Sequence, residues 1–319
     1  MAGITGQGTT FNLPNFVGDL FSITPADTPL LSAIGGLTGG EQTNAKLFDW
    51  GFYDLRAPAD TTKVEGANAP TAEERVRSTA YNVVEIHQEA VEISYTKQAA
   101  VGQFGVTIDQ RIEGAGNVGD ELEWQVDQAL LQIALDIEWS FINQTFANPA
   151  TNATPRKTRG LLAAIATNVT VGGGLALTEA MVLDTMQLAW TNGGFQVDET
   201  RTVIVNAREK RSLTKIFVTA KGFAESTRNV GGVNVQTIET DFGVVNVMLD
   251  RHLPQGNIII ASLEELAPVF LLIPDKGFLF VEELAKVGAA ERRQIYGEVG
   301  LKYGNERKHA KITGVIAAA

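Results

Sequence analysis

The residues of this chain that most closely match a chemical motif are the glycines of GAGNVG, which are Gly114, Gly116 and Gly119. They fit G-x-G-x-x-G, the pattern with which dinucleotide-binding proteins bring a pyrophosphate to the amino end of a helix. That reading requires a helix of ordinary length, then a parallel strand with an acidic residue at its end. Here the acidic residues about twenty positions on, Asp136 and Glu138, fall inside a long helical pattern. Because the chain has 32 glycines, we interpret the match as chance and keep a nucleotide-binding enzyme only as an alternative.

The other residues that could do chemistry do not form a catalytic or metal-binding set. Asp241, Phe242 and Gly243 match the metal-binding tripeptide of kinases, but no kinase catalytic loop accompanies them, so a hairpin turn is expected. The three histidines lie far apart along the chain and show none of the paired spacings of zinc sites. The chain has no cysteine, which excludes disulfides, thiolate nucleophiles and cysteine-ligated metals. The sequence therefore predicts no enzyme activity, no cofactor and no metal site.

Charge and composition exclude two further classes of protein. The net charge of −11 argues against a dedicated nucleic-acid binder, because neutralising phosphates requires a clustered basic surface. A short basic patch at Arg156, Lys157 and Arg159 either meets acidic groups on a neighbour or faces solvent. No apolar run approaches the ~20 residues that span a membrane, and residues 1–10 lack a signal-peptide pattern. With 319 residues, 44% of them hydrophobic, the chain can bury more than one core, and we expect a soluble protein made inside the cell.

The elements that position these residues begin with two strand-like runs, residues 47–55 and 81–95, joined by a long polar connection. Phe48, Trp50 and Phe52 alternate onto one face of the first run, and the apolar phase of the second run slips, which indicates a bulge or bend. A two-stranded ribbon is marginally stable alone, and no third strand-like run adjoins this one. We therefore predict that Phe48, Trp50 and Phe52 contact a neighbouring copy of the chain. This favours an assembly protein over an enzyme.

A single long amphipathic helix is predicted from residue 119 or 120 to residue 146, with a length of ~40 Å. Acidic residues in its first turn favour the positive end of the helix dipole, and Asn148 and Pro149 end it. The helix is expected to be buried along an apolar stripe. The stripe consists of Leu122, Val126, Leu130, Ile133, Ile137 and Phe141, and Trp124, Leu131, Leu135 and Trp139 widen it.

Helices and strands alternate after this helix. Residues 178–191 are predicted to form a helix with Thr178 as its N-cap and Asn192 at its end. A basic helix follows a short strand at residues 202–205 and begins at the cap residue Asn206. This mixture of helices and largely antiparallel strands predicts an α+β fold. The further strands are expected at residues 233–240, 244–249, 258–261, 269–273, 278–281, 294–301 and 310–316.

Four blocks of the chain carry a resemblance to a known family. They are TPLLSAIG at residues 28–35, ELEWQVDQALLQIALDIEW at residues 121–139, DFGVVNVMLDRHLP at residues 241–254 and ERRQIYGEVGLKYGNERKHAKITGV at residues 291–315. On these blocks the chain resembles the tailed-bacteriophage major capsid proteins with the HK97-like shell fold. The resemblance runs over nearly the whole chain.

This resemblance implies an α+β HK97-like capsid fold that consists of an arm, an extended loop, a peripheral domain and an axial domain. An N-terminal arm and an extended β-hairpin loop (the E-loop) would both reach onto neighbouring subunits. Arg208, Lys210 and Arg211 would lie where axial domains meet around the symmetry axes. The implied parts are the arm at residues 1–45, the E-loop at 46–95, a peripheral domain at 96–159 with a spine helix at 120–146, an axial domain at 160–284, and peripheral closing strands at 285–319.

The resemblance also implies a function. The chain would be a virion component, assembled in the host cytoplasm through hexamers and pentamers into the icosahedral head of a tailed bacteriophage. Its partners would be other copies of itself, a portal protein, and scaffolding and decoration proteins, and the shell would enclose double-stranded DNA without reading its sequence or contacting a membrane. The shell protein of an encapsulin-type nanocompartment is the alternative. Some relatives cross-link a loop lysine to another subunit, and Lys46 and Lys63 lie in the corresponding region.

Overall fold

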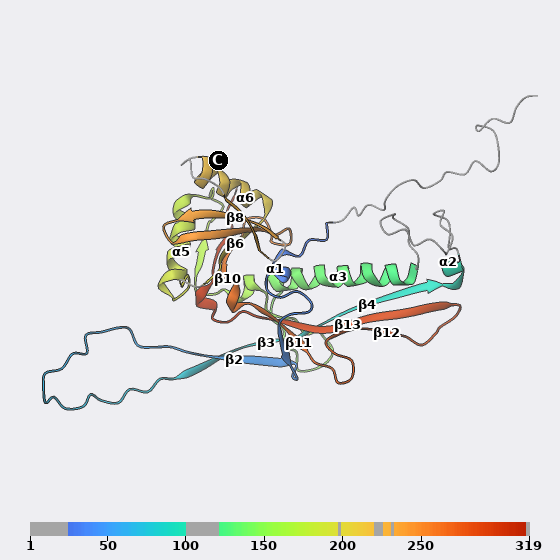
Figure 1. Ribbon diagram of the computed structural model, residues 1–319, viewed down its shortest axis with the longest axis horizontal. Coiled ribbons are helices and arrows are strands. Elements are labelled where there is room, and N and C mark those ends of the chain that lie inside the picture. The colour runs from blue at the N-terminus through green and yellow to red at the C-terminus, as the bar shows by residue number, and fades with distance from the viewer. Residues whose placement is uncertain (1–24, 100–120, 197–198, 220–225, 231–232, 317–319) are drawn as a thin grey trace, which may run out of the picture. The chain divides into compact units, whose positions relative to one another are not determined.

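The computed structural model describes residues 25–99, 121–196, 199–219, 226–230 and 233–316 (Figure 1). The GAGNVG segment and the first 24 residues of the expected arm lie outside the described residues. The chain divides into two compact units. The smaller unit consists of Met1–Asp27, Gln88–Ile133 and Val281–Ile295, and the larger unit of Thr28–His87, Ala134–Phe280 and Tyr296–Ala319.

The smaller unit is tied together by polar contacts between segments far apart in sequence. The backbone N–H of Tyr95 donates to the Ala289 carbonyl at 3.2 Å, and Gln88 Nε2 donates to Gln294 Oε1 at 2.8 Å. Such bonds give these backbone and side-chain polar groups a hydrogen-bond partner within the chain in place of water. Gln88 lies in β4 (Glu85–Ser94), Tyr95 in α2 (Tyr95–Ala99) and Gln294 in β13 (Ala290–Lys302), and Ala289 directly precedes β13.

The predicted long helix is present as α3 (Glu121–Asn143). Its stripe is buried as expected at all positions except Leu130, which is partly covered. Leu131 and Trp139, which were expected to widen the stripe, are instead exposed, so the apolar face is narrower than the sequence suggested. The helix ends three residues early because the Asn143 side chain turns back to the Trp139 carbonyl (3.2 Å) and bonds the His252 carbonyl (2.8 Å).

A seven-stranded sheet forms the core of the larger unit. Its strands run in the order β5-β14-β10-β6-β9-β8-β7, with β5/β14 and β6/β9 parallel and the other described pairs antiparallel. Val205, Ile258 and Ile312 are fully buried, and Met186 of α5 and Phe195 pack with them. The strands are β5 (Val169–Val171), β6 (Arg201–Val205), β7 (Ser226–Val230), β8 (Val233–Thr240), β9 (Gly243–Leu249), β10 (Ile258–Ser262) and β14 (Ala310–Thr313).

Local sequence signals set the ends of the elements around this sheet. Helix α5 (Glu179–Thr191) begins where the Thr178 hydroxyl accepts from the Met181 N–H at 3.3 Å, as predicted. Helix α6 (Ala207–Leu213) begins after Asn206, whose side chain accepts from the Ala207 N–H, and a π-helical segment, η1 (Thr214–Thr219), continues it. The tripeptide at residues 241–243 is the turn between β8 and β9, where Gly243 has φ +98°.

A second sheet has the order β1-β11-β13-β12, and β4 also pairs with β13. The predicted second strand of the hairpin is in fact two strands. Val84 separates them, and its N–H donates to the Lys46 carbonyl at 3.0 Å. The break lies earlier than the expected slip because Val83 and Val84 are both fully buried, which an uninterrupted strand with alternating faces does not allow. The remaining strands here are β1 (Glu41–Thr43), β2 (Leu47–Tyr53), β3 (Arg77–Val83), β11 (Ala267–Leu271) and β12 (Leu279–Glu283).

Four short helical segments complete the described chain, and none of its helices combines the length and apolar character that a membrane crossing requires. The closing strand β14, which was expected with the peripheral part, pairs with β10 and β5 in the seven-stranded sheet. The short segments are α1 (Pro29–Ala33), α4 (Leu161–Ala164), η2 (Leu263–Glu265) and η3 (Glu306–Lys308).

Candidate assembly surface

The base of the β2–β3 ribbon is anchored within its own chain. Phe48 is only 8% exposed and packs with Val84 and Val269. Gly300 of β13 makes room for the ring, since a Cβ there would lie 2.7 Å from Phe48 Cε1. The indole N–H of Trp50 donates to the Gly304 carbonyl at 2.7 Å. The expectation that Phe48 and Trp50 are left for a neighbour is therefore corrected, because β11 and the segment after β13 supply the covering layer.

The distal part of the ribbon is different, because its apolar side chains have no such cover. Phe52 and Tyr53 at the end of β2 are exposed, and so is Leu55 beyond it, at 66%. Residues 54–76, which connect β2 to β3, contain no helix or strand and extend away from the ribbon (Figure 1). Val64 in this connection is 82% exposed. Exposed apolar side chains gathered on one segment are typical of an interaction site rather than of a free surface.

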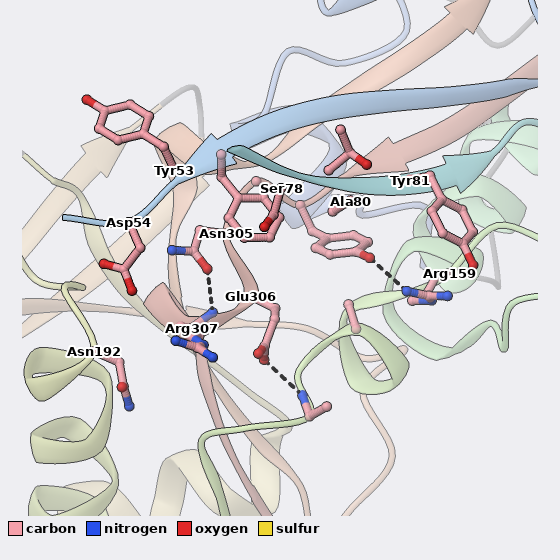
Figure 2. A pocket seen from close by; sticks show the side chains of 16 residues that line it. Tyr53, Asp54, Ser78, Ala80, Tyr81, Arg159, Asn192, Asn305, Glu306 and Arg307 are labelled. Carbon is pink, nitrogen blue, oxygen red and sulfur yellow. Dashed lines mark hydrogen bonds between the residues drawn. The ribbon is translucent and has the colours of Figure 1, made fainter. Parts of the chain in front are cut away.

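A cavity of about 560 Å³ lies beside the end of the ribbon (Figure 2). Arg159 lines it and donates to the Tyr303 hydroxyl at 2.9 Å, while its guanidinium stacks 4.6 Å from the centre of the Phe146 ring. Burial is the main cause that raises the pKa of Tyr303. Glu306 is also engaged, because its carboxylate accepts from the backbone N–H groups of residues 166 and 167. Arg159, Tyr303 and Glu306 therefore hold segments of the chain together at this cavity.

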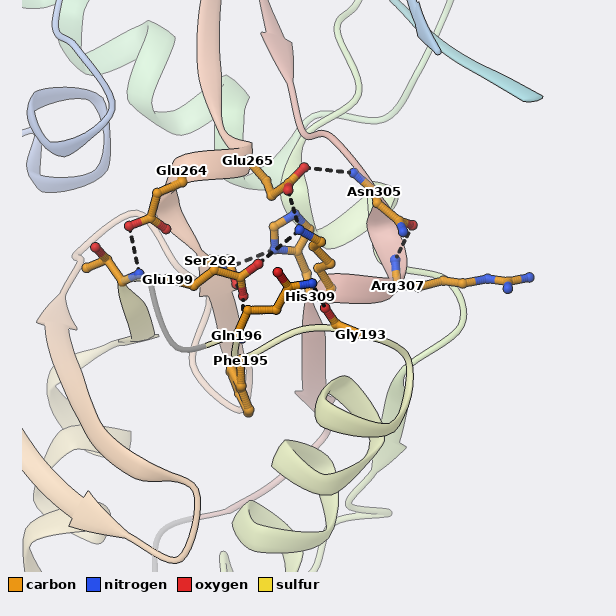
Figure 3. A network of polar contacts seen from close by, with 12 residues as sticks. Gly193, Phe195, Gln196, Glu199, Ser262, Glu264, Glu265, Asn305, Arg307 and His309 are labelled. Carbon is orange, nitrogen blue, oxygen red and sulfur yellow. Dashed lines mark hydrogen bonds and ion pairs between the residues drawn. The ribbon is translucent and has the colours of Figure 1, made fainter. Parts of the chain in front are cut away.

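A second cavity, of about 620 Å³, follows residues 50–55 and borders a network of ion pairs (Figure 3). The Lys308 ammonium lies between the Glu199 and Glu265 carboxylates, at 2.9 and 2.6 Å. Burial alone would raise the pKa of Glu199, but hydrogen bonds from Lys308 and Ser262 outweigh it and hold that pKa below its usual value. Burial alone would lower the pKa of Lys308, but its two carboxylate partners raise it. Glu199 and Lys308 therefore remain charged and paired.

His309 lies beneath this network and is fully buried. Its Nδ1 accepts from the Ser262 N–H at 3.3 Å, and its Nε2 bonds the Tyr303 carbonyl at 2.9 Å, which requires the neutral ring with the proton on Nε2. Burial lowers the pKa of His309 accordingly. Within the described ranges, no group of three or more histidine and acidic side chains is arranged to hold a metal ion. The histidine is therefore a structural residue that joins β10 to the segment after β13.

The predicted basic contact residues are largely used within the chain. Arg208 bonds the buried Glu209 carboxylate at 2.6 Å and the Val315 carbonyl at 3.0 Å, and Lys210 is buried. Of the basic helix, Arg211 stays exposed. In the basic patch, Arg156 pairs with Glu298 of its own chain at 2.7 Å. The predicted contact residues therefore do not form one surface: Phe52 lines the cavities beside the ribbon, whereas Arg208 is bonded and Lys210 buried near α6.

Sequence reasoning missed the residues that anchor the ribbon, namely Gly300, Tyr303 and Gly304. The bond from Trp50 to Gly304 spans 254 positions, so no local pattern marks either partner. The one available signal was the closing block of the sequence, in which glycines recur inside a strand, a spacing that often marks the close approach of another segment.

Solved structures share this fold across nearly the whole chain. The capsid of cyanophage A-1(L) is 12% identical, with a TM-score of 0.65 over 98% of this chain and 99% of that one. The capsid of a native GTA particle is 13% identical, with a TM-score of 0.61 over 98% and 97%. The SrpI encapsulin complex of Synechococcus elongatus PCC 7942 is 13% identical, with a TM-score of 0.58 over 96% and 92%. The mixed α+β fold is thus the HK97-like capsid fold.

The particular family follows from the sequence as a whole. The family model for the SU10 major capsid protein matches residues 3–315, and the chain belongs to that family. It is therefore a major capsid protein of a tailed-phage head, a structural component of the virion that assembles with copies of itself, and not an enzyme. No curated protein sequence matches the chain.

Proposed function

We propose that the connection at residues 54–76, together with the exposed end of β2, docks on an adjacent subunit of the same shell. The observation that carries the proposal is the contrast along the ribbon. Phe48 is covered by its own chain, whereas Leu55 and Val64 are exposed. Burying apolar surface contributes roughly 25 cal/mol per Å², so these side chains favour contact with another molecule.

The contacts inside the connection support this proposal because they are few and exposed. Glu73 pairs with Arg56 at 3.4 Å and with Arg75 at 3.0 Å, and all three side chains are about half exposed. Surface ion pairs of this kind are worth ~0–1 kcal/mol each, too little to fix a segment of this length. An adjacent subunit would supply the missing apolar contact. Of the predicted contact residues, Phe52 fits this role directly, and Arg211 is available for a separate contact.

The domain roles that the resemblance implies form part of the same proposal. In it, residues 1–45 are the arm, 46–95 the E-loop, 160–284 the axial domain, and residues 96–159 with 285–319 the peripheral domain, except that β14 joins the sheet of the axial domain. Helix α3 would then be the spine helix. The order of elements supports this, since a ribbon precedes the long helix and a mixed sheet follows it.

The remaining partners follow from the role of a head protein. The subunit would form hexamers and pentamers, meet a portal protein at one vertex, and contact scaffolding and decoration proteins. The shell would enclose double-stranded DNA without binding it tightly. A net charge of −11 agrees with this, because tight binding would require basic residues that neutralise the phosphates. An encapsulin-type compartment is the rival, since one shares the fold. Particles purified from producing cells should contain DNA, and particles filled with a cargo enzyme would favour the rival.

The docking proposal can be tested with a double variant, Leu55→Ser with Val64→Ser. Both side chains are exposed in the subunit, so the thermal stability of free subunits should stay unchanged while shells fail to form, as seen by electron microscopy. The matched control is Leu55→Met with Val64→Ile, which keeps the apolar area and should assemble. Normal shell yield from the double serine variant would refute the proposal.

A further inference from the structure

Helix α1 is capped by a carboxylate from another part of the chain. The N–H groups of Leu30 and Leu31 donate to Glu138 Oε1 and Oε2 at 2.8 and 2.6 Å. Glu138 lies in α3, more than 100 residues later, and is 0% exposed. Thr28, at the N-cap position, makes no capping bond with its side chain. The first turn of α1 thus depends on Glu138 for its hydrogen-bond acceptor.

A second buried carboxyl group faces the first. Asp250, just after β9, is 1% exposed and hydrogen-bonds Glu138 side chain to side chain. It also accepts from the His252 N–H at 2.8 Å. Two buried carboxyl groups within hydrogen-bonding distance of each other cannot both stay ionised, because their negative charges repel and water does not screen them. The pair therefore shares one proton. Burial first, and the charge and hydrogen bond of Asp250 next, raise the pKa of Glu138 to about 9.

Helix α1 has five residues and no titratable side chain. Its Leu30 and Leu31 are buried, and the helix contacts β8 and β9. The chain enters α1 directly from its N-terminal segment, so whatever holds α1 also holds the attachment point of that segment. Charged or titratable residues close in sequence to the pair, or on the strands that α1 contacts, are Asp136 of α3, Glu239 of β8, and Arg251 and His252 after Asp250.

We propose that Glu138 and Asp250 form a proton-dependent latch that fastens α1 to α3 and to the segment after β9, within the larger unit. With the proton in place, the pair accepts the two α1 amides without charge repulsion. Loss of the proton leaves two adjacent buried negative charges, and hydrating them requires α1 to leave. The latch does not depend on the loop contact proposed above, because it lies wholly within one subunit.

The direction of the pH dependence follows from the raised pKa of Glu138. In the docked state this pKa is about 9, against 4.5 for the free side chain, so the docked state binds the proton more tightly. Docking is therefore strongest below about pH 4.5 and weakens as pH rises toward 9. Between these limits one proton is released on opening, so the docking equilibrium should fall about tenfold per pH unit.

Hydrogen exchange of the Leu30 and Leu31 amides in the full-length subunit tests this. After correction for the intrinsic pH dependence of exchange, wild-type protection should fall about a hundredfold from pH 6 to pH 8. Glu138→Gln, which cannot titrate, should show protection that is flat with pH, and Asp250→Asn should show a shallower slope. Asp184→Asn, an exposed carboxylate on α5, is the matched control and should keep the wild-type slope.

Two results would overturn the latch. The first is wild-type protection that does not change between pH 6 and 8, a measurement that needs no variant to fold. The second is a Glu138→Gln slope equal to that of the wild type, which would place the titrating group elsewhere.

Discussion

The substitution Trp50→Phe tests whether the ribbon is held by contacts within its own chain. The indole N–H donates to the Gly304 carbonyl at 2.7 Å, and the ring meets Tyr303 edge to face with centroids 4.8 Å apart. It also lies 5.9 Å from the Phe48 ring. Phenylalanine keeps an aromatic ring and the strand preference at this position, but it removes the hydrogen bond and the far edge of the indole.

The expected loss of stability is about 2 kcal/mol. The hydrogen bond contributes ~1 kcal/mol net, and the carbonyl of Gly304 then lacks its donor. The smaller ring gives up apolar contact worth roughly another 1 kcal/mol, on the order of one buried methylene. For a chain of 319 residues, such a loss corresponds to a fall in Tm of roughly 3 °C.

Urea denaturation of free subunits, followed by circular dichroism, measures this loss. The matched control is Trp190→Phe, because Trp190 on α5 is 57% exposed and its replacement should change stability by less than ~0.5 kcal/mol. If Trp50→Phe left the free energy of unfolding unchanged and affected only shell formation, the ribbon would be held by a neighbour rather than by its own chain. The anchoring described here would then be wrong.

Three further predictions concern the core and the buried histidine. Ile133→Asp places an unpaired charge in the buried stripe of α3 at a cost of several kcal/mol, and soluble subunits of normal thermal stability would contradict the burial of that stripe. Burial lowers the pKa of His309 in the folded state. The neutral ring therefore contributes its full stability above about pH 6.5, the pKa of a free histidine. As pH falls from there toward the folded pKa, the free energy of unfolding should drop by ~1.4 kcal/mol per pH unit. His309→Gln, whose amide can accept from Ser262 and donate to Tyr303, should flatten the stability curve at acid pH in urea titrations, and an unchanged acid slope would exclude His309 as its source. Gly300→Ala should cost ~1–3 kcal/mol by crowding the Phe48 ring and the Val83 carbonyl oxygen. Phe48→Leu should recover the part of the loss that the ring causes, and additive losses in the double variant would assign the crowding to the Val83 carbonyl.

The parts of the fold that could be predicted from the sequence are those whose signals are local. The cap at Thr178, the cap at Asn206 and the turn at residues 241–243 each depend on side chains within a few positions, and all three are confirmed. The long helix was equally clear because its apolar positions repeat over many turns.

The parts that could not be predicted depend on partners distant in sequence. Phe48 and Trp50 read as an uncovered face because the strands that cover them lie more than 200 residues away. The break at Val84 has the same cause, since burial on both faces comes from tertiary packing that no alternation reveals. Glu138 was seen only as an acid inside a helix. Its role as a cap for α1 depends on a pairing across 108 positions.

The anchoring of Trp50 by Gly304 also sets an order of events during synthesis. The two residues are 254 positions apart, so at ~5–20 residues per second the ribosome reaches Gly304 about 13–50 s after Trp50. Until then the aromatic face of the ribbon lacks its own cover, and the emerging chain exposes it to other chains. The subunit would therefore become competent to present a fixed loop only near the end of translation. Chaperones that shield emerging apolar strands would have their main task in that interval.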